Sequence, residues 1–146
     1  MKPFYTLLLF IFFISCSSND NDFGEENDAE IQEYIKTHNL NATKTASGLY
    51  YVITDPGNGI TPNASSSVTV NYKGYFTNGT LFEQNKNVTF NLQQVIPGWT
   101  EGLTYFSEGA QGWLLIPSHL GYGNSGTGNI PGGSVIIFSI HLLKIN

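Results

Sequence analysis

Apolar and polar residues alternate over long stretches of the chain after residue 48. A period of two residues is typical of a β-strand that buries one face, and it predicts mainly β-structure beyond this point. The segments with this pattern, or with a short apolar run between turn residues, are 49–54, 67–76, 80–83, 88–92, 112–117 and 134–145. In the two longest segments, the residues predicted to face the core are Val68, Val70, Tyr72, Phe76, Ile136, Phe138, Ile140 and Leu142.

Two segments have helical spacing or length instead. Residues 28–38 form a helical pattern that begins near Asn27 or Asp28 as the cap. Its predicted apolar face consists of Ile31, Tyr34, Ile35 and His38. The segment QVIPGWTEGL (94–103) has room for only a short helix. One short helix against five to six mainly antiparallel strands, with an extra N-terminal helix, is an α+β layout. Asn78 and Gly79 favour a two-residue hairpin turn within it.

The N-terminal residues have the pattern of an export signal. Lys2 precedes an apolar run at 4–14, which is shorter than the roughly 20 residues of a membrane-spanning helix. The run ends at FISC, and Cys16 in this context resembles the lipidated cysteine of the bacterial lipoprotein lipobox. The alternative is an ordinary secretory signal with an incidental cysteine. We expect a signal peptide at 1–15, lipidated Cys16 and a flexible acidic tether at 16–28, an N-terminal helix and lead-in at 29–45, and the main domain at 46–146.

Composition and charge narrow the function. The chain of 146 residues has no arginine and its lysines are scattered, so a nucleic-acid surface is not expected, because phosphate neutralisation needs clustered cations. Cys16 is the only cysteine, which excludes disulfides and cysteine-based metal sites. The three histidines lack metal-ligand spacing. The segment GYGNSG (121–126) lacks the helix and the acidic residue that a dinucleotide fingerprint requires. We therefore expect neither a metal nor a cofactor.

Four segments occur in a characteristic order along the chain. They are VNYKGYFTNGTLFE, VTFNLQQVIPGWTEGL, GWLLIPSHLGYG and IPGGSVIIFSIHLL. Over residues 48–145 this order resembles the FKBP-type peptidyl-prolyl cis-trans isomerases, the immunophilins that bind macrolide inhibitors. The resemblance implies a twisted antiparallel sheet wrapped around a short helix, an FKBP-type isomerase domain at 46–146, and catalysis of cis/trans exchange at X-Pro bonds.

The resemblance also implies a pocket. Trp99 would begin the short helix and form the floor of a concave apolar pocket for a proline ring, while the Ile96 N–H and the Tyr122 hydroxyl would hold the substrate backbone. The residues carried over by position are Tyr72, Phe82, Glu83, Val95, Ile96, Trp99, Tyr122, Ile130 and Phe138. Ordinary core packing is the alternative for each ring. An apolar pocket solvates the planar dipolar amide poorly, so the twisted amide becomes more accessible without a nucleophile.

Two positions depart from the family pattern. Glu83 stands where aspartate is usual, so its carboxylate extends one methylene further. Val88 stands at a second wall phenylalanine, which would widen the pocket. Both departures imply weakened binding of macrolide inhibitors.

The sequence leaves three roles open. The first is a monomeric, lipid-anchored isomerase of the bacterial cell envelope that acts on proline-containing segments of exported proteins. The second is a non-catalytic proline-peptide-binding or chaperone module of an envelope machine. The lead-in NLNATKTASGLYYVI resembles that of FKBP-like lipoproteins of gliding Bacteroidetes, which implies a link to motility or secretion. The third is a glycan-binding β domain that uses Trp99, Tyr122 and Tyr75.

Overall fold

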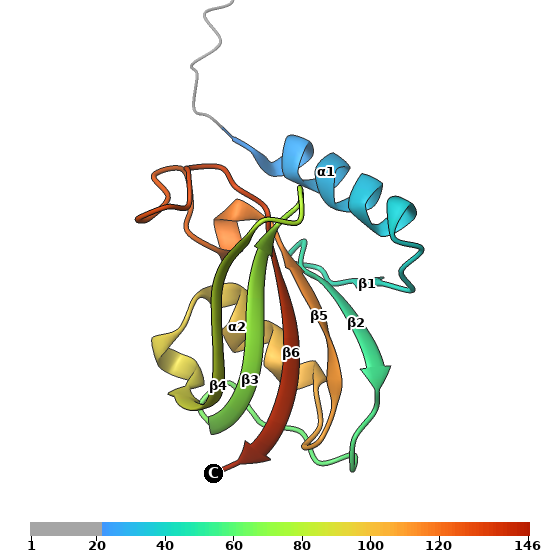
Figure 1. The fold of residues 1–146 in the computed structure, drawn as a ribbon, viewed down its shortest axis with the longest axis vertical. Coiled ribbons are helices and arrows are strands. Elements are labelled where there is room, and N and C mark those ends of the chain that lie inside the picture. The colour runs from blue at the N-terminus through green and yellow to red at the C-terminus, as the bar shows by residue number, and fades with distance from the viewer. Residues whose placement is uncertain (1–21) are drawn as a thin grey trace, which may run out of the picture.

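The computed structural model describes residues 22–146, so the predicted signal peptide and Cys16 lie outside the described residues. Six antiparallel strands form one sheet in the order β1-β2-β5-β6-β3-β4 (Figure 1). The strands are β1 (Thr43–Lys44), β2 (Tyr50–Asp55), β3 (Ser67–Phe76), β4 (Leu81–Asn91), β5 (Gln111–Ile116) and β6 (Ile136–Ile145). The helices are α1 (Gly24–Thr37) and α2 (Pro97–Gly102), and single 3₁₀ turns occur at Leu92–Gln94, Leu103–Tyr105 and Ser118–Leu120.

This architecture confirms the predicted α+β class, with one short helix on the sheet and an extra helix at the N-terminal side. The predicted core faces of the two long strands are also confirmed. Seven of the eight residues are buried, and the eighth, Phe76, is partly buried and packs against them. The two-residue strand β1 is too short to leave a pattern in the sequence. Within residues 22–146, none of the helices is long and apolar enough to cross a membrane.

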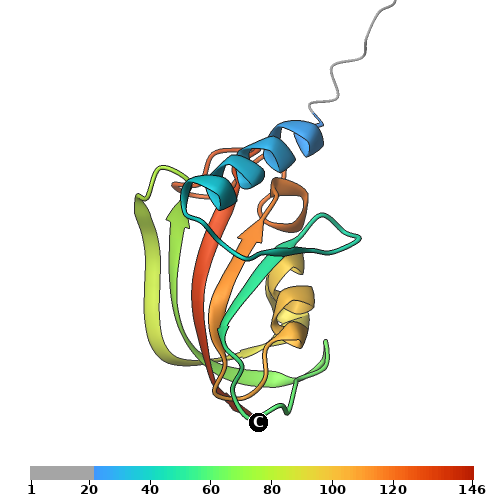
Figure 2. The same ribbon diagram turned by 90° about the vertical axis from the view of Figure 1, so that its right-hand side faces the viewer.

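The two helices lie on opposite faces of the sheet (Figure 2). We call the face that carries α2 the inner face, where the main core includes Trp99, Phe106 and Phe138. We call the opposite face the outer face, where α1 buries Ile31 in a second, smaller core with Leu115. Figure 1 shows that α1 crosses only one end of the sheet. No other helix of residues 22–146 covers the rest of the outer face.

The segments 80–83 and 88–92, predicted as two strands, are parts of the single strand β4, so that prediction is wrong. A bulge joins them, and within it Asn87 has a φ of 54°. The Asn87 N–H donates to Asn71 Oδ1 over 2.8 Å. Asparagine tolerates the left-handed region better than most residues, and a bulge lets a strand continue past an extra residue.

The β3–β4 hairpin has a three-residue loop rather than the predicted two-residue turn. The Gly79 N–H donates to the Phe76 carbonyl over 2.9 Å, and the Phe76 N–H donates to the Thr80 carbonyl over 2.9 Å. Gly79 has a φ of 86°, whereas Asn78 is not among the residues with positive φ. The predicted turn needs positive φ at both central residues, whereas a type I turn followed by a left-handed glycine needs it only at the glycine.

Helix α1 begins at Gly24 rather than at Asp28, so the end of the predicted tether is helical. Asn27, predicted as a cap, is instead a buried helical residue that is 1% exposed. Its Nδ2 donates to the Gly133 carbonyl over 2.9 Å, and its Oδ1 accepts from the Ser118 N–H over 2.8 Å. These two bonds tie the first turn of α1 to the loops after β5, which explains why the helix extends so far toward the N-terminus.

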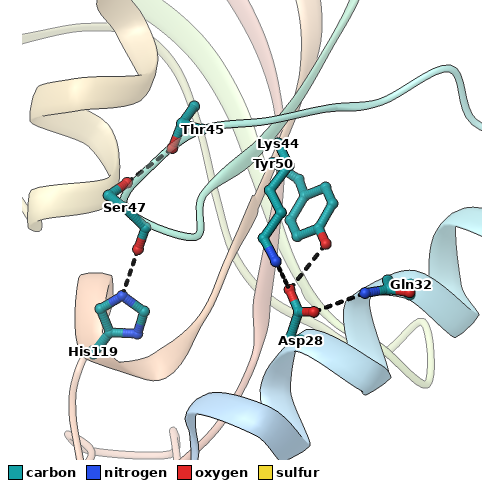
Figure 3. Close-up of polar contacts among 7 residues, drawn as sticks. All are labelled: Asp28, Gln32, Lys44, Thr45, Ser47, Tyr50 and His119. Atoms are coloured by element: carbon teal, nitrogen blue, oxygen red, sulfur yellow. Dashed lines mark hydrogen bonds and ion pairs between the residues drawn. The ribbon is translucent and has the colours of Figure 1, made fainter.

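A polar cluster also fastens α1 to the sheet (Figure 3). The Asp28 carboxylate lies 2.7 Å from Lys44 Nζ and accepts hydrogen bonds from the Tyr50 hydroxyl over 2.9 Å and from Gln32 Nε2 over 2.7 Å. The bond to Lys44 holds the pKa of Asp28 below its usual value, against the opposing effect of partial burial. The cluster thus joins α1 to β1 and β2.

Candidate functional site

A cavity of about 430 Å³ lies on the inner face of the sheet, beside α2. Strands β3, β4 and β6, the start of α2 and the loop after β5 contribute to its wall. The lining residues are Tyr72, Glu83, Phe90, Gln94, Val95, Ile96, Trp99, Tyr122 and Phe138. Aromatic and aliphatic side chains make up most of the lining, with few polar groups. Cavities of this size and character commonly bind small ligands or single side chains.

Trp99 lies at the base of this cavity and is only 4% exposed. Its ring centroid lies 5.1 Å from that of Tyr72, 5.4 Å from that of Phe90 and 5.2 Å from that of Phe138. The interplanar angles are 90°, 85° and 84°, in the same order. Edge-to-face contacts of this kind are a favoured geometry of aromatic pairs. Three of them, from three strands, fix the orientation of the indole.

Two glycines allow α2 to approach the sheet closely enough to place Trp99. A Cβ atom on Gly98 would lie 2.7 Å from Ile116 Cγ2, and one on Gly102 would lie 2.6 Å from Leu114 Cδ2. Both distances are shorter than real Cβ contacts. The glycine before Trp99 is therefore needed for close packing of α2 on β5, and not for a positive φ.

Glu83 brings a carboxylate to the rim of the cavity. The Tyr72 hydroxyl donates a hydrogen bond to Glu83 Oε1 over 2.7 Å. Burial raises the pKa of Tyr72, and the hydrogen bond and the charge of Glu83 raise it further. Burial, followed by the same charge, raises the pKa of Tyr122. Both phenols therefore remain protonated donors throughout the neutral range.

Several donors at the cavity have no partner among residues 22–146. The Ile96 carbonyl accepts the Trp99 N–H over 2.9 Å, whereas the Ile96 N–H and the Tyr122 hydroxyl donate to no acceptor in this part of the chain. Trp99 Nε1 is the only buried side-chain nitrogen or oxygen there without a hydrogen bond. Unpaired buried donors are rare in folded proteins and call for an explanation. The Ile96 N–H and the Tyr122 hydroxyl are available to the polar groups of a ligand, whereas Trp99 Nε1 is buried.

The structure brings seven of the nine predicted site residues into the cavity lining. The other two, Phe82 and Ile130, are not among the lining residues. Phe82 packs against Phe76 at 5.0 Å and against Phe138 at 5.8 Å between ring centroids. Ile130 is 8% exposed and belongs to the inner core. Phe82 thus supports Phe138, a wall residue, and Ile130 is part of the core on the same face.

Sequence reasoning missed Phe90 and Gln94, which complete the lining. The expectation that Val88 leaves this wall open is wrong, because the Phe90 ring lies there against Trp99. The missing signal was the strand register. Phe90 pairs with Val68, whose side chain lies in the inner core, so Phe90 points to the same face. Because β4 was predicted as two separate strands, its pairing register with β3 could not be inferred from the sequence.

Comparison with known proteins agrees with this fold and cavity. A family model described as "FKBP-type peptidyl-prolyl cis-trans isomerase" matches residues 58–143, which is more than half of the chain. The chain therefore belongs to the family of FKBP-type peptidyl-prolyl cis-trans isomerases.

Curated relatives include the FKBP-type peptidyl-prolyl cis-trans isomerase FkpA of Aeromonas hydrophila, which is 40% identical over 129 residues and aligns 82% of this chain with 47% of its own. FkpA of Escherichia coli strain K12 is 38% identical over 126 residues, with the same two shares. The chain thus spans about half the length of these curated relatives.

Two crystal structures show the same architecture. FkpA from Escherichia coli superposes with a TM-score of 0.75 at 34% identity, covering 84% of this chain and 61% of the other. A peptidyl-prolyl cis-trans isomerase from Pseudomonas syringae pv. tomato DC3000 superposes with a TM-score of 0.73 at 29% identity, covering 84% of this chain and 95% of the other. The predicted FKBP-like sheet around a short helix is therefore confirmed.

Proposed function

We propose that this chain is a peptidyl-prolyl cis-trans isomerase acting on X-Pro bonds of exported or envelope proteins. The observation that carries the proposal is the aromatic cavity, with Trp99 at its base and the free Ile96 N–H at its edge. A proline ring is apolar and has no N–H, so it can enter such a cavity without losing a hydrogen bond. The carbonyl groups on either side of the ring can use the donors.

The proposed catalysis requires no nucleophile, and the lining contains no serine, cysteine or histidine. Rotation about the amide bond has a barrier of roughly 18–20 kcal/mol, because the planar form has C–N double-bond character. That form is dipolar, and water stabilises it. An apolar wall of Trp99, Phe90 and Phe138 stabilises it less, so the twisted transition state is favoured relative to the planar ground state.

The donors position the substrate backbone in this proposal. Tyr122 supplies a hydroxyl and Ile96 an N–H to the peptide carbonyls. Because their environments raise the pKa values of Tyr72 and Tyr122 above the usual 10, neither phenol titrates near neutrality. We therefore expect turnover to change little between about pH 6 and 8, the range in which a histidine would titrate. A bell-shaped profile in that range would contradict the desolvation mechanism.

Tyr122→Phe tests the positioning role. Loss of one neutral hydrogen bond, worth about 0.5–1.5 kcal/mol, should slow isomerisation by roughly three- to tenfold. The measurement is cis/trans exchange of a short X-Pro peptide by NMR. Tyr105→Phe is the matched control, because Tyr105 is 40% exposed and does not line the cavity. Equal rates for the parent and Tyr122→Phe would remove Tyr122 from the mechanism.

The alternative function, a proline-peptide-binding or chaperone module, is favoured by one observation. Glu83 departs from the family's aspartate, and its carboxylate is engaged by the Tyr72 hydroxyl. This role expects no measurable turnover in the parent protein, with peptide affinity that still depends on Trp99. We also propose that macrolide inhibitors bind weakly for the same reason, and that Glu83→Asp strengthens their binding while changing peptide turnover much less.

We further propose that Cys16 is lipidated and that the acidic tether connects this anchor to the domain at the bacterial envelope. The sequence FISC and the short apolar run before it support this proposal. Cys16→Ser should release the protein from membranes or leave it as an unprocessed precursor. Unchanged membrane fractionation at the mature size would overturn the lipoprotein assignment. Association with a gliding or secretion machine, and a monomeric state, remain proposals that rest on the sequence resemblance.

A further inference from the structure

Helix α1 leaves most of the outer face uncovered (Figure 1). A second cavity, of about 730 Å³, lies on this part of the sheet. Its floor is the sheet itself. Tyr72, Gly112 and Ile140 are register neighbours on β3, β5 and β6, and the Tyr72 and Ile140 side chains belong to the inner core. The side chains before and after them on each strand therefore point outward. We call this cavity the outer groove.

Two rows of outward side chains cross the outer groove. The first row is Trp113–Ser139–Lys73–Gln84, from β5 through β6 and β3 to β4, and the second is Gln111–His141–Asn71. Neighbouring strands are about 4.8 Å apart, so each row presents a polar group roughly every 5 Å. The groove thus offers a regular array of amide, hydroxyl, imidazole and ammonium groups.

The charge of the outer groove differs from that of the whole chain. Its lining includes Lys73 and Lys86 but no aspartate or glutamate, although the chain carries 11 acidic and 6 basic residues. The ion pair that the structure shows in residues 22–146 joins Lys44 to Asp28, so Lys73 and Lys86 have no carboxylate partner there. Unpaired ammonium groups without nearby acids attract an anionic ligand.

An aromatic surface forms one end of the outer groove. The Tyr75 and Trp113 rings lie 6.3 Å apart between centroids, tilted by 35°, and both are only half-buried. Both also pack against the small core under α1. They are therefore held rigidly while part of each ring stays open to solvent. Rigid, partly exposed rings combine apolar contact area with a low entropic cost of binding.

We infer that the outer groove binds an acidic oligosaccharide. The ring pair can stack on the apolar face of a sugar, the amide and hydroxyl side chains can bond to its hydroxyl groups, and Lys73 and Lys86 can pair with its carboxylates. An acidic peptide fits less well, because an extended peptide that adds to a sheet usually does so by backbone pairing at an exposed edge. The outer groove lies mainly across β3, β5 and β6, whose backbone groups are paired with neighbouring strands on both sides, and only β4 at its border is an edge strand. The site is distinct from the Trp99 cavity on the inner face.

Binding of tetragalacturonate to the full chain in mild detergent, measured by isothermal titration calorimetry, tests this inference. We expect saturable binding that weakens with added salt, because exposed charges are screened. The Lys73→Gln/Lys86→Gln double variant should bind roughly three- to tenfold more weakly, as expected for two exposed ion pairs. Lys36→Gln/Lys144→Gln is the control, because it removes the same charge outside the groove and should bind as the parent does.

Neutral cellotetraose and tetraglutamate complete the test. Cellotetraose should bind more weakly than tetragalacturonate, and tetraglutamate more weakly still. Gln111→Ala, a surface change, should weaken sugar binding without unfolding, and a thermal melt checks the fold. Absence of tetragalacturonate binding, equal loss in both lysine pairs, or tighter binding of tetraglutamate would overturn the inference, the last by reassigning the groove to acidic peptides. Turnover of an X-Pro peptide by the same variants reports separately on the inner site.

Discussion

The two faces of the sheet form their cavities in different ways. On the inner face, the cavity is a part of the hydrophobic core that the six-residue helix α2 leaves uncovered, and Trp99 at its base is 4% exposed. On the outer face, the larger cavity lies beyond the end of the core under α1, where polar side chains stand on the sheet. The inner cavity is an opening in the hydrophobic core, whereas the outer groove is a polar surface beyond the end of the small core under α1.

This difference predicts how each face responds to change. Residues of the inner cavity take part in packing, so substitutions there should affect stability and function together. The polar residues of the outer groove stand on a sheet that is already held by its other face, so substitution of these polar residues should affect binding alone. The four predictions that follow test this contrast, beginning with the largest expected effect.

Trp99→Ala should abolish isomerase activity and lower the free energy of unfolding by about 3–5 kcal/mol, as for other buried aromatic truncations. The three edge-to-face contacts of Trp99 would be lost together. Trp99→Phe is the companion variant, since it keeps a ring and removes the unpaired Nε1. Urea unfolding and peptide exchange measure the two effects. A folded Trp99→Ala variant with parental activity would show that the inner cavity is not the functional site.

Asn27→Ala should destabilise the outer face by roughly 2–4 kcal/mol, because it leaves the Gly133 carbonyl and the Ser118 N–H without partners, and each unsatisfied buried group costs about 1–3 kcal/mol. The loss should appear as early unfolding of α1 in hydrogen exchange, with the inner core still protected. Lys36→Ala, on the exposed side of α1 and outside the Asp28 cluster, is the control. Uniform loss of protection over both faces would show that the two cores unfold as one unit.

The sequence predicted the fold where one face of a strand is buried. Burial of one face requires apolar side chains at every second residue, and this alternation predicted the core positions of β3 and β6. It failed where the backbone departs from a regular pattern. The bulge at Asn87 made one strand look like two, and the burial of Asn27 by distant loops could not be seen in local helix signals. Both features depend on partners far away in sequence.

The inner site was predictable for a different reason. Its residues follow the order of a known family, so seven of the nine expected positions line the cavity. Phe90 was missed because its place depends on register, and the outer groove was missed because its lining residues come from five strands and share no motif. A cluster that forms only across strands leaves no linear pattern. Such sites have to be found from the structure.

Gly98→Ala should lower the free energy of unfolding by about 1–3 kcal/mol, because a new Cβ atom 2.7 Å from Ile116 Cγ2 would overpack the contact between α2 and β5. It should also slow isomerisation by moving Trp99. A double-mutant cycle sharpens the test. In an Ile116→Ala background, which is itself less stable, the added methyl group has space and its cost should largely disappear. An unchanged cost in that background would assign the effect to the backbone of α2 and not to the contact.

The smallest expected effect is a difference between the two faces in how their stability depends on pH. The pKa of Asp28 is lowered in the folded protein, so its contribution to stability is complete above the unfolded value near 3.8 and is lost as the pH falls through the folded value. The pKa of Tyr72 is raised, so its contribution is complete below the unfolded value near 10 and is lost as the pH rises beyond it. Acid should therefore loosen α1 first. Alkali should weaken the inner cavity through Tyr72 and also the cluster under α1, where the pKa values of Lys44 and Tyr50 are raised. Asp28→Asn should reduce the acid dependence of the thermal midpoint between about pH 5 and 3, because the titrating carboxylate is gone. Tyr72→Phe should reduce the alkaline dependence and leave the acid limb unchanged. If Asp28→Asn left the acid limb unchanged, the contacts of the Asp28 carboxylate would not be what fastens α1 to the sheet.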